Sequence, residues 1–403
     1  MRTDEALALL TEKLDCVTGP EMVGTADALG RILLEDIVAS ANIPPHDNSA
    51  VDGYAVYFDD LNQDGPTRLR VTGRQPAGQA PGKPPQRGEA LRIFTGAVMP
   101  DGPDTVMMQE DCTLEGEWLV IPAGIKRGAN RRDAGEDVRA GTRVLSRGRR
   151  LRAQDLGQAA AVGRSELKVS TPLRVALFST GDELREPGET LDAGAIHDSN
   201  RYTLHGLLKS LGCRVSDLGI LLDKADIIEP ALSQAAQEHD VVITSGGVSV
   251  GEEDHVKQAV EALGRIHAWR LAIKPGRPIA FGQIGRVPFI GLPGNPVAVM
   301  VTFAVIVRPL LLRLMGGDVT APQRFPVRAD FSYRKKKDRR EWLRVNLRPG
   351  SDGVWSAEKF PRDGAGILSS LVESQGLVEL PEEITKVEPG TLVDYLPFSE
   401  VIG

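Results

Sequence analysis

The sequence is poor in cysteine and histidine, and this shortage excludes several classes of site. Its three cysteines, Cys16, Cys112 and Cys213, lie far apart in a chain of 403 residues. Such spacing is neither a disulfide framework nor a zinc signature, and free cysteines of this kind usually pack as small buried hydrophobes. The six histidines show no HExxH motif and no other paired-ligand spacing. The chemistry of this chain therefore falls to other residue types.

The sequence also lacks an excess of positive charge and a long apolar run. The net charge is −7, whereas a general nucleic-acid binder needs a basic field, so we expect no nucleic-acid partner. No apolar run approaches the roughly 20 residues of a membrane span, and the first residues, MRTDEALALL, do not have the pattern of a secretory signal. We therefore expect a cytoplasmic protein that does not enter a membrane.

Several catalytic motifs are missing as well. There is no G-x-x-x-x-G-K-[ST] sequence, no G-x-G-x-x-G in the first strand-to-helix turn, no nucleophile elbow and no Ser-His-Asp arrangement. These absences argue against a P-loop NTPase and against covalent catalysis. They favour electrostatic, metal-assisted chemistry.

Changes in the hydrophobic pattern divide the chain into four predicted domains. Residues 1–45 and 141–172 together should form a discontinuous helical or mixed domain, since neither piece alone could bury much core. Short apolar runs between Gly and Pro clusters predict a small β-rich domain over 46–140. Strands that alternate with helices predict an α/β domain with a mainly parallel sheet over 173–318. Residues 319–403 return to short strands and predict a C-terminal β domain of barrel or sandwich type.

Apolar periodicity places the helices within these domains. The expected helices cover 3–15, 26–30, 150–163, 199–211, 226–239, 254–263 and 297–315. The run over 76–90 has neither helical nor strand period and is expected to be a loop.

Gly-rich or charged turns follow five strands of the predicted α/β domain. Ligands bind at the carboxyl ends of the strands of an open parallel sheet, so these turns should share one rim. One such turn is usually only a turn, but five on one rim predict a ligand site. The residues are Thr180, Gly181, Asp182, Glu183, Asp223, Ser245, Gly246, Gly247, Ser249, Lys274, Gly276, Arg277, Pro293, Gly294, Asn295 and Pro296.

The residue types at this rim suit an anion beside a metal ion. Glycines let backbone N–H groups approach phosphate oxygens, Lys274 and Arg277 add positive charge, and Asn295-Pro296 should begin a helix whose N-terminus favours an anion. Carboxylates next to an anion indicate Mg²⁺ or another hard cation. The candidate metal ligands are Asp182, Glu183, Asp223 and Asp254, and the sequence leaves open which of them bind the metal directly.

Two basic stretches lie outside the rim turns. For RGANRR (127–132), which precedes further acids, we expect contact with a phosphate-bearing ligand. For Lys335–Lys337 in RKKKDRR we expect a solvated loop or a charged edge strand.

Eight stretches, spread over essentially the whole chain, resemble the molybdopterin molybdenumtransferases, whose eukaryotic relative is the gephyrin E domain. They are DNSAVDGYA, RIFTGAVMPDGPDTVMMQED, NRRDAGEDV, LFSTGDEL, HDSNRYTL, DVVITSGGVSVGEEDH, LAIKPGRP and GLPGNPVA.

The resemblance implies an elongated four-domain homodimer with its site in a cleft between subunits. It implies insertion of molybdate into adenylylated molybdopterin with release of AMP, assisted by Mg²⁺, and the molybdopterin adenylyltransferase as a candidate protein partner. The family's functional positions match Asp52, Thr95, Asp137, Glu183, Asp223, Asp254, Lys274 and Arg344 in this chain.

Two positions depart from the family pattern. Arg270, which we place among the substrate-binding residues, stands where the family often has Lys, and Arg and Lys differ in geometry. Ala365 stands where the family usually has Ser, so a hydroxyl contact is missing there.

Two other functions remain as alternatives. One is a molybdopterin-binding scaffold, which the relation to gephyrin suggests. The other is a relative that only adenylylates molybdopterin. The full set of acids favours an enzyme, and the flanking DGYA and GED segments argue against the adenylyltransferase, which needs the α/β domain alone.

Overall fold

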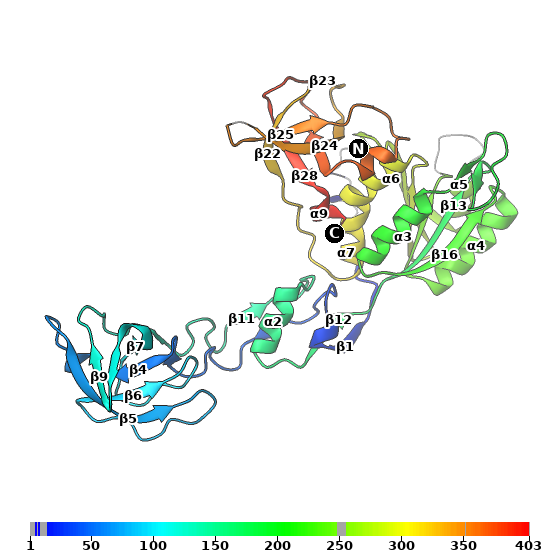
Figure 1. Cartoon of the computed structure of the whole chain (residues 1–403). Coiled ribbons are helices and arrows are strands. Elements are labelled where there is room, and N and C mark those ends of the chain that lie inside the picture. The colour runs from blue at the N-terminus through cyan, green and yellow to red at the C-terminus, as the bar shows by residue number, and fades with distance from the viewer. Residues whose placement is uncertain (1–4, 6, 9–13, 248–254, 351, 403) are drawn as a thin grey trace.

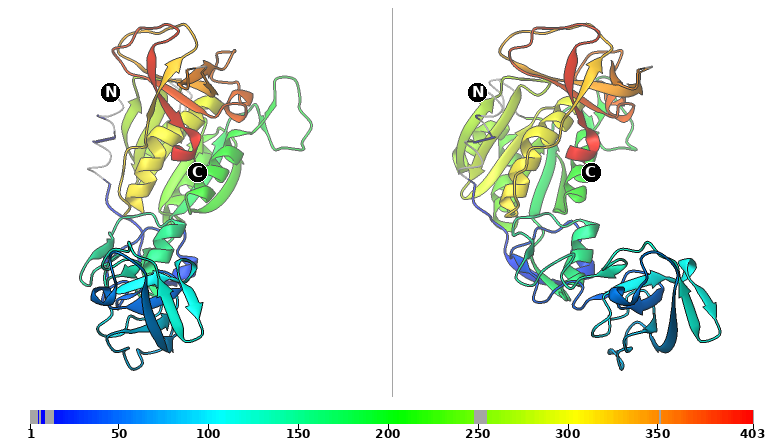
Figure 2. Two further views of the ribbon diagram at one scale, coloured as in Figure 1. Left: turned by 60° about the vertical axis from the view of Figure 1, so that its left-hand side comes forward. Right: turned by 90° about the vertical axis from the view of Figure 1, so that its left-hand side faces the viewer.

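A computed structural model of the chain describes residues 5, 7–8, 14–247, 255–350 and 352–402. The molecule is elongated, with a small β domain at one end and the α/β domain and a barrel together at the other (Figures 1 and 2). A joining domain lies between the two ends. The proposed limits of these four domains are those predicted from the sequence.

The joining domain is built from two distant pieces of the chain. Strand β1 (Pro20–Gly24) pairs antiparallel with β12 (Glu166–Ser170), and β2 (Ile37–Val38) pairs with β11 (Arg143–Leu145). Helix α2 (Ala153–Ala161) contributes to the same core. The helix expected over 26–30 is instead a single 3₁₀ turn, Thr25–Asp27, because so short a segment has no room for a stable α-helix.

The described part of the expected N-terminal helix packs against another domain. Glu5, Leu7 and Ala8 are helical. Leu7 and Leu14 pack against the core of the α/β domain rather than that of the joining domain. The periodicity therefore identified the helix, but the sequence could not show which core its apolar face covers.

The small β domain contains a six-stranded sheet in the order β7-β4-β6-β5-β9-β8. These strands are β4 (Gly53–Val56), β5 (Thr67–Gln75), β6 (Glu89–Ile93), β7 (Thr105–Met108), β8 (Thr113–Glu115) and β9 (Trp118–Ile121). Residues 76–88 join β5 to β6 as a loop, as predicted. A short pair, β3 (Asn48–Ser49) and β10 (Arg131–Arg132), closes the end next to the joining domain.

The α/β domain has a six-stranded sheet in the order β16-β13-β17-β21-β20-β18. Its strands are β13 (Arg174–Thr180), β16 (Arg214–Leu221), β17 (Val241–Ser245), β18 (Gly264–Arg270), β20 (Pro278–Ile284) and β21 (Val287–Leu292), and its helices include α3 (Asn200–Ser210), α4 (Ala225–Glu238) and α5 (His255–Leu263).

Strand β20 was not predicted, because it follows the KPGRP turn with no helix between. It pairs antiparallel with both β18 and β21. Two reversals make β18 run in the same direction as β21. The turns after β13, β16, β17, β18 and β21 therefore leave the same edge of the sheet, which confirms the predicted rim.

A long apolar helix forms the core beside this sheet. Its segments α6 (Pro296–Thr302), η4 (Phe303–Val307) and α7 (Arg308–Leu314) are continuous. By length and composition its 19 residues could cross a membrane, so the expectation that no run approaches such a length was wrong. The helix is 78% buried inside the protein, where its side chains join the largest core cluster.

The C-terminal domain is a closed five-stranded barrel. Its strands are β22 (Phe325–Ala329), β24 (Arg340–Pro349), β25 (Trp355–Lys359), β26 (Gly376–Leu380) and β28 (Leu392–Pro397). Strand β24 pairs with both β25 and β26, which closes the barrel. Outside the barrel, β23 (Tyr333–Arg334) pairs with β27 (Lys386–Val387).

One two-residue strand joins the barrel to the α/β domain. Strand β19 (Ile273–Lys274) pairs parallel with the start of β24, and Lys274 lies opposite Glu341. The turn that carries Lys274 is therefore held by backbone pairing to the barrel.

We predict that the long helix is essential for stability. The substitution Leu311→Ala, at a fully buried position, should lower the free energy of unfolding by about 2–5 kcal/mol, because it leaves a cavity. The matched control Leu392→Ala, at a side chain that is 63% exposed, should change it by less than about 0.5 kcal/mol. Denaturant titration of both variants measures the difference, and equal losses would contradict the core role of the helix.

Candidate functional site

Two cavities open at the rim and share one turn. The rim cavity, of about 350 Å³, is lined by residues that include Thr180, Glu183, Ser245, Gly246 and Pro296. The interdomain cavity, of about 360 Å³, lies between the rim and the barrel. Gly294 and Asn295 line both cavities, so a ligand long enough to pass this turn could occupy both.

Asn200 fixes the turns of the rim cavity to each other. Its Nδ2 donates to Ser245 Oγ at 2.9 Å and to the Gly294 carbonyl at 2.7 Å. Ser245 Oγ in turn donates to the Pro293 carbonyl at 3.3 Å. Asn200 and Ser245 are both buried, and these bonds join the first turn of α3 to the turns after β17 and β21.

Two glycines are required by the shape of their turns. Gly246 has φ +89°, and a Cβ there would lie 2.3 Å from the Thr180 carbonyl oxygen. Gly276 has φ +97°, and a Cβ there would lie 2.4 Å from Thr302 Oγ1. Glycine at position 246 therefore allows the turns after β13 and β17 to approach each other closely. Glycine at position 276 allows its turn to approach α6, at a distance that a side chain would prevent.

The interdomain cavity contains two cationic side chains. Lys274 comes from the rim and Arg344 from strand β24 of the barrel. Arg344 is buried, and its Nε donates to Ser370 Oγ at 3.0 Å while Nη2 donates to backbone carbonyls. Within the described ranges no carboxylate forms an ion pair with Arg344. Burial lowers the pKa of Arg344, yet an arginine remains charged near neutral pH, so Arg344 offers positive charge to a ligand in a cavity that Glu341 and Asp363 also line.

Those predicted rim acids that the structure describes do not gather into one metal cluster. Glu183 lines the rim cavity, whereas Asp182 and Asp223 line neither cavity. In the part of the chain that the structure describes, no group of three His, Cys, Asp or Glu side chains could hold a metal ion. Ser249, Asp254 and the side chain of Arg270 lie outside the described residues.

The remaining predicted rim residues divide in the same way. Gly276, Pro293, Gly294 and Asn295 line the interdomain cavity, whereas Gly181, Gly247 and Arg277 line neither. Ala365, the departure from the family pattern, also lines the interdomain cavity, and its carbonyl accepts the N–H of Val297 at 2.9 Å.

Asp52 and Thr95 form a compact pair, but they lie far from the rim within one chain. The Thr95 backbone N–H and hydroxyl each donate to Asp52 Oδ1 at 2.8 Å. Asp52 directly precedes β4, which belongs to the small β domain, at the opposite end of the molecule from β13 (Figure 1). Asp137, where the small β domain meets the joining domain, is exposed. A single chain thus does not bring the predicted residues together.

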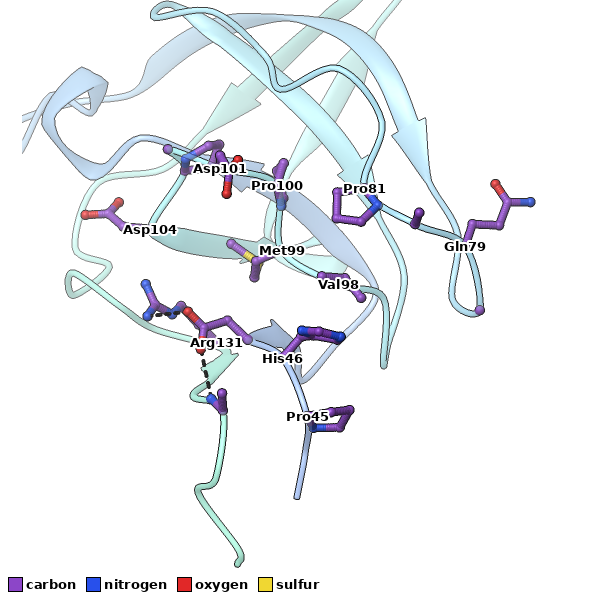
Figure 3. A pocket seen from close by; sticks show the side chains of 16 residues that line it. Pro45, His46, Gln79, Pro81, Val98, Met99, Pro100, Asp101, Asp104 and Arg131 are labelled. Atoms are coloured by element: carbon purple, nitrogen blue, oxygen red, sulfur yellow. Dashed lines mark hydrogen bonds and ion pairs between the residues drawn. The ribbon is translucent and has the colours of Figure 1, made fainter. Parts of the chain in front are cut away.

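Two of the three arginines in the basic stretch 127–132 form ion pairs with neighbouring acids. Arg127 pairs with Asp59 and Asp104, and Arg131 pairs with Asp47 and Asp133. A cavity of about 760 Å³ lies beside Arg131, His46 and Met99 (Figure 3). Arg131, the arginine that lines this cavity, is engaged in ion pairs with Asp47 and Asp133. The larger volume of this cavity therefore does not make it a better anion site than the cavities at the rim.

Sequence reasoning missed four residues that shape the cavities. Asn200 was quoted only within HDSNRYTL, and nothing in its spacing showed that it would reach two other turns. Tyr333 and Glu341 contact the ammonium group of Lys274, and Arg339 donates to Glu341. They belong to the C-terminal domain, and the pairing of β19 with β24 brings them to the rim.

The α/β domain with its rim and the adjoining barrel has the architecture of a protein with a molybdopterin-binding type of domain. Three family models match in order: the MoeA N-terminal region (domain I and II) over residues 1–163, a probable molybdopterin binding domain over 176–313, and the MoeA C-terminal region (domain IV) over 326–398.

Similar proteins extend over nearly the full chain. A molybdopterin molybdenumtransferase of Haemophilus influenzae is 38% identical, with 99% of each chain covered. One of Nostoc sp. is 37% identical over 96% of this chain and 91% of its own. A solved structure of the molybdopterin biosynthesis moeA protein of Pyrococcus horikoshii is 29% identical with a TM-score of 0.84, covering 98% of this chain and 99% of its own. The chain belongs to the molybdopterin molybdenumtransferase family.

We predict that Thr95 keeps Asp52 ionised at unusually low pH. The hydrogen bond from the Thr95 backbone N–H, then that from its hydroxyl, lowers the pKa of the Asp52 carboxyl, and the charge of Arg92 acts in the same direction. Thr95→Val should raise this pKa toward its ordinary value without reaching it, since the backbone bond remains. A carbon NMR titration of the Asp carboxyl groups measures it.

The stability that this pair contributes should depend on pH in one direction. Because the folded pKa of Asp52 is lowered, its contribution is present above the ordinary carboxyl pKa and is lost as pH falls through the folded value. Thr113→Val, at an exposed threonine of the same domain, serves as the control. An unchanged Asp52 titration in the Thr95 variant would show that the hydroxyl plays no part.

Proposed function

We propose that the protein is a molybdopterin molybdenumtransferase that inserts molybdate into adenylylated molybdopterin and releases AMP. The observation that carries the proposal is the interdomain cavity, where Lys274 and the buried Arg344 face a space of about 360 Å³ beside a glycine-rich rim. Molybdate is a tetrahedral dianion, and it resembles phosphate in preferring N–H donors and positive charge.

In this proposal the two cavities hold different parts of the reactants. The interdomain cavity takes the oxyanion, because its cations have spare hydrogen-bond donors. The rim cavity, with Thr180, Ser245, Gly246 and the start of α6, takes the phosphate-bearing part of adenylylated molybdopterin. The shared Gly294–Asn295 turn places the two next to each other, which lowers the entropic barrier to reaction.

We propose that a magnesium ion binds at the rim together with substrate, with Glu183, the one predicted acid among the described residues that lines the rim cavity, as its first protein ligand. Mg²⁺ usually takes one or two carboxylates and completes its coordination with substrate phosphates and water. Asp182, Asp223 and Asp254 are further candidate ligands. When bound, the ion would neutralise charge on the phosphates during displacement at phosphorus. The donors of the rim and Lys274 would orient the reacting groups and hold the remaining negative charge.

We further propose a cytoplasmic homodimer with each site in a cleft between subunits. The separation of the Asp52–Thr95 pair from the rim supports this, because a second copy can supply the pair that one chain keeps at its far end (Figure 1). The molybdopterin adenylyltransferase, whose product would be the substrate here, is proposed as a transient partner.

We predict that removing the charge of Arg344 abolishes most molybdate-dependent AMP release. Arg344→Met keeps the length of the stem but deletes the donors, and loss of such a preorganised group lowers turnover by about 10²–10³-fold. The assay supplies adenylylated molybdopterin, molybdate and Mg²⁺ and measures AMP. Arg348→Met, on the same strand but exposed, is the control. Absence of molybdate-dependent AMP release by the wild-type protein would contradict the transferase.

We predict that two inactive variants complement each other if the site lies between subunits. Asp52→Asn disables the small β domain and Lys274→Met disables the rim. In a random mixture about half the dimers are mixed, and each mixed dimer has one intact site of two, so roughly a quarter of wild-type activity should return. Failure to complement in mixed dimers demonstrated by sedimentation would contradict the cleft between subunits.

A further inference from the structure

We propose that Tyr333 and Glu341 of the C-terminal domain are positioning residues that hold the ammonium group of Lys274 at the mouth of the interdomain cavity. The inference rests on the proposed function for the role of Lys274. It goes beyond that function because it assigns to the C-terminal domain a role in fixing the position and the protonation of Lys274.

A short chain of hydrogen bonds connects the three side chains. Lys274 Nζ donates to Tyr333 Oη at 3.0 Å, and Tyr333 Oη donates to Glu341 Oε2 at 2.8 Å. Lys274 Nζ also lies 3.4 Å from Glu341 Oε2. An ammonium group has three donors. These contacts occupy at most two of them, so at least one remains for a ligand in the cavity.

Glu341 anchors this chain because it is deeply buried. It is only 1% exposed, and a buried carboxylate must be paired to be tolerated. Arg339 Nε donates to Glu341 Oε1 at 2.9 Å, and Arg339 Nη2 donates to the same oxygen. One carboxylate therefore balances two cations, and the cluster keeps a net positive charge beside the cavity.

The backbone around the cluster is also held in place. Lys274 lies opposite Glu341 in the β19–β24 pairing, and Arg340 N donates to the Ala272 carbonyl at 3.0 Å. Lys335, expected to be solvated, is instead buried, and its Nζ donates to the Arg339 carbonyl at 2.5 Å. It thereby fixes the connection between Tyr333 and Arg339, whereas Lys336 and Lys337 are exposed as predicted.

The contacts shift the titration of Lys274 in a definite direction. Burial lowers the pKa of Lys274, but the hydrogen bond from its ammonium to Tyr333 and the charge of Glu341 outweigh burial, and the pKa is raised. The other charged side chains that line the same cavity are Arg344 and Asp363. Anion binding that needs the ammonium should persist below this pKa and be lost as pH rises through it, and removal of Tyr333 or Glu341 should move that loss to lower pH.

The first test measures Lys274 without any substrate. In the full-length protein, Lys274 is modified with an amine-acylating reagent over a range of pH, and its modification is quantified by mass spectrometry against exposed Lys83. Tyr333→Phe and Glu341→Gln should each lower the pKa of Lys274, so that modification at a fixed alkaline pH becomes about two- to threefold faster. Tyr395→Phe, a buried tyrosine in the barrel core, is the matched control and should leave the rate unchanged.

The second test separates positioning from fold stability. For molybdate-dependent AMP release, Tyr333→Phe should raise the KM for molybdate more than it lowers kcat. The fall in activity on the alkaline side of its pH–rate profile should also move to lower pH. The Tyr395 variant should do neither. A Lys274 titration that is unchanged in folded Tyr333→Phe and Glu341→Gln proteins would overturn the proposal. Because labelling needs no turnover, that result is distinct from failure of the transferase assay, which would overturn the proposed function alone.

Discussion

Two residues of backbone pairing, Ile273 and Lys274 with Arg340 and Glu341, are the contact on which the candidate site depends. The pairing brings a barrel strand to the rim of a parallel sheet that is otherwise open. It creates the interdomain cavity, because Arg344 follows three residues after Glu341 on the same strand. It also places a buried carboxylate behind Lys274, so the anion site is shared by two domains from the outset.

The other turns of the rim lie very close to each other and to α6. Gly246 and Gly276 allow turns to contact each other and α6, where a Cβ would clash. Asn200 joins the turns after β17 and β21 through two hydrogen bonds from its side-chain amide. These contacts fix the turns in place, and such preorganisation favours binding of an oxyanion, since the groups around it do not have to reorganise.

The elongated shape has a functional consequence. The Asp52–Thr95 pair is well formed but lies at the far end of the chain from the rim (Figure 1). A pair of this kind stabilises its own turn, yet it cannot act on a ligand in the rim cavity of the same subunit. In the proposed mechanism, formation of the dimer is therefore required to bring the Asp52–Thr95 pair to the rim.

The sequence by itself determined the order of the elements, the parallel sheet and the shared rim, because hydrophobic period and glycine-rich turns are local properties of the chain. It did not reveal β20, which has no helix before it, nor the core that Leu7 joins. Only the tertiary structure decided that Asn200 reaches Ser245, that Lys335 is buried, and that Tyr333 and Glu341 stand behind Lys274. Asn200 and Ser245 are 45 positions apart, and Lys274 and Glu341 are 67 positions apart and belong to different domains. No local pattern encodes which distant side chain will meet which.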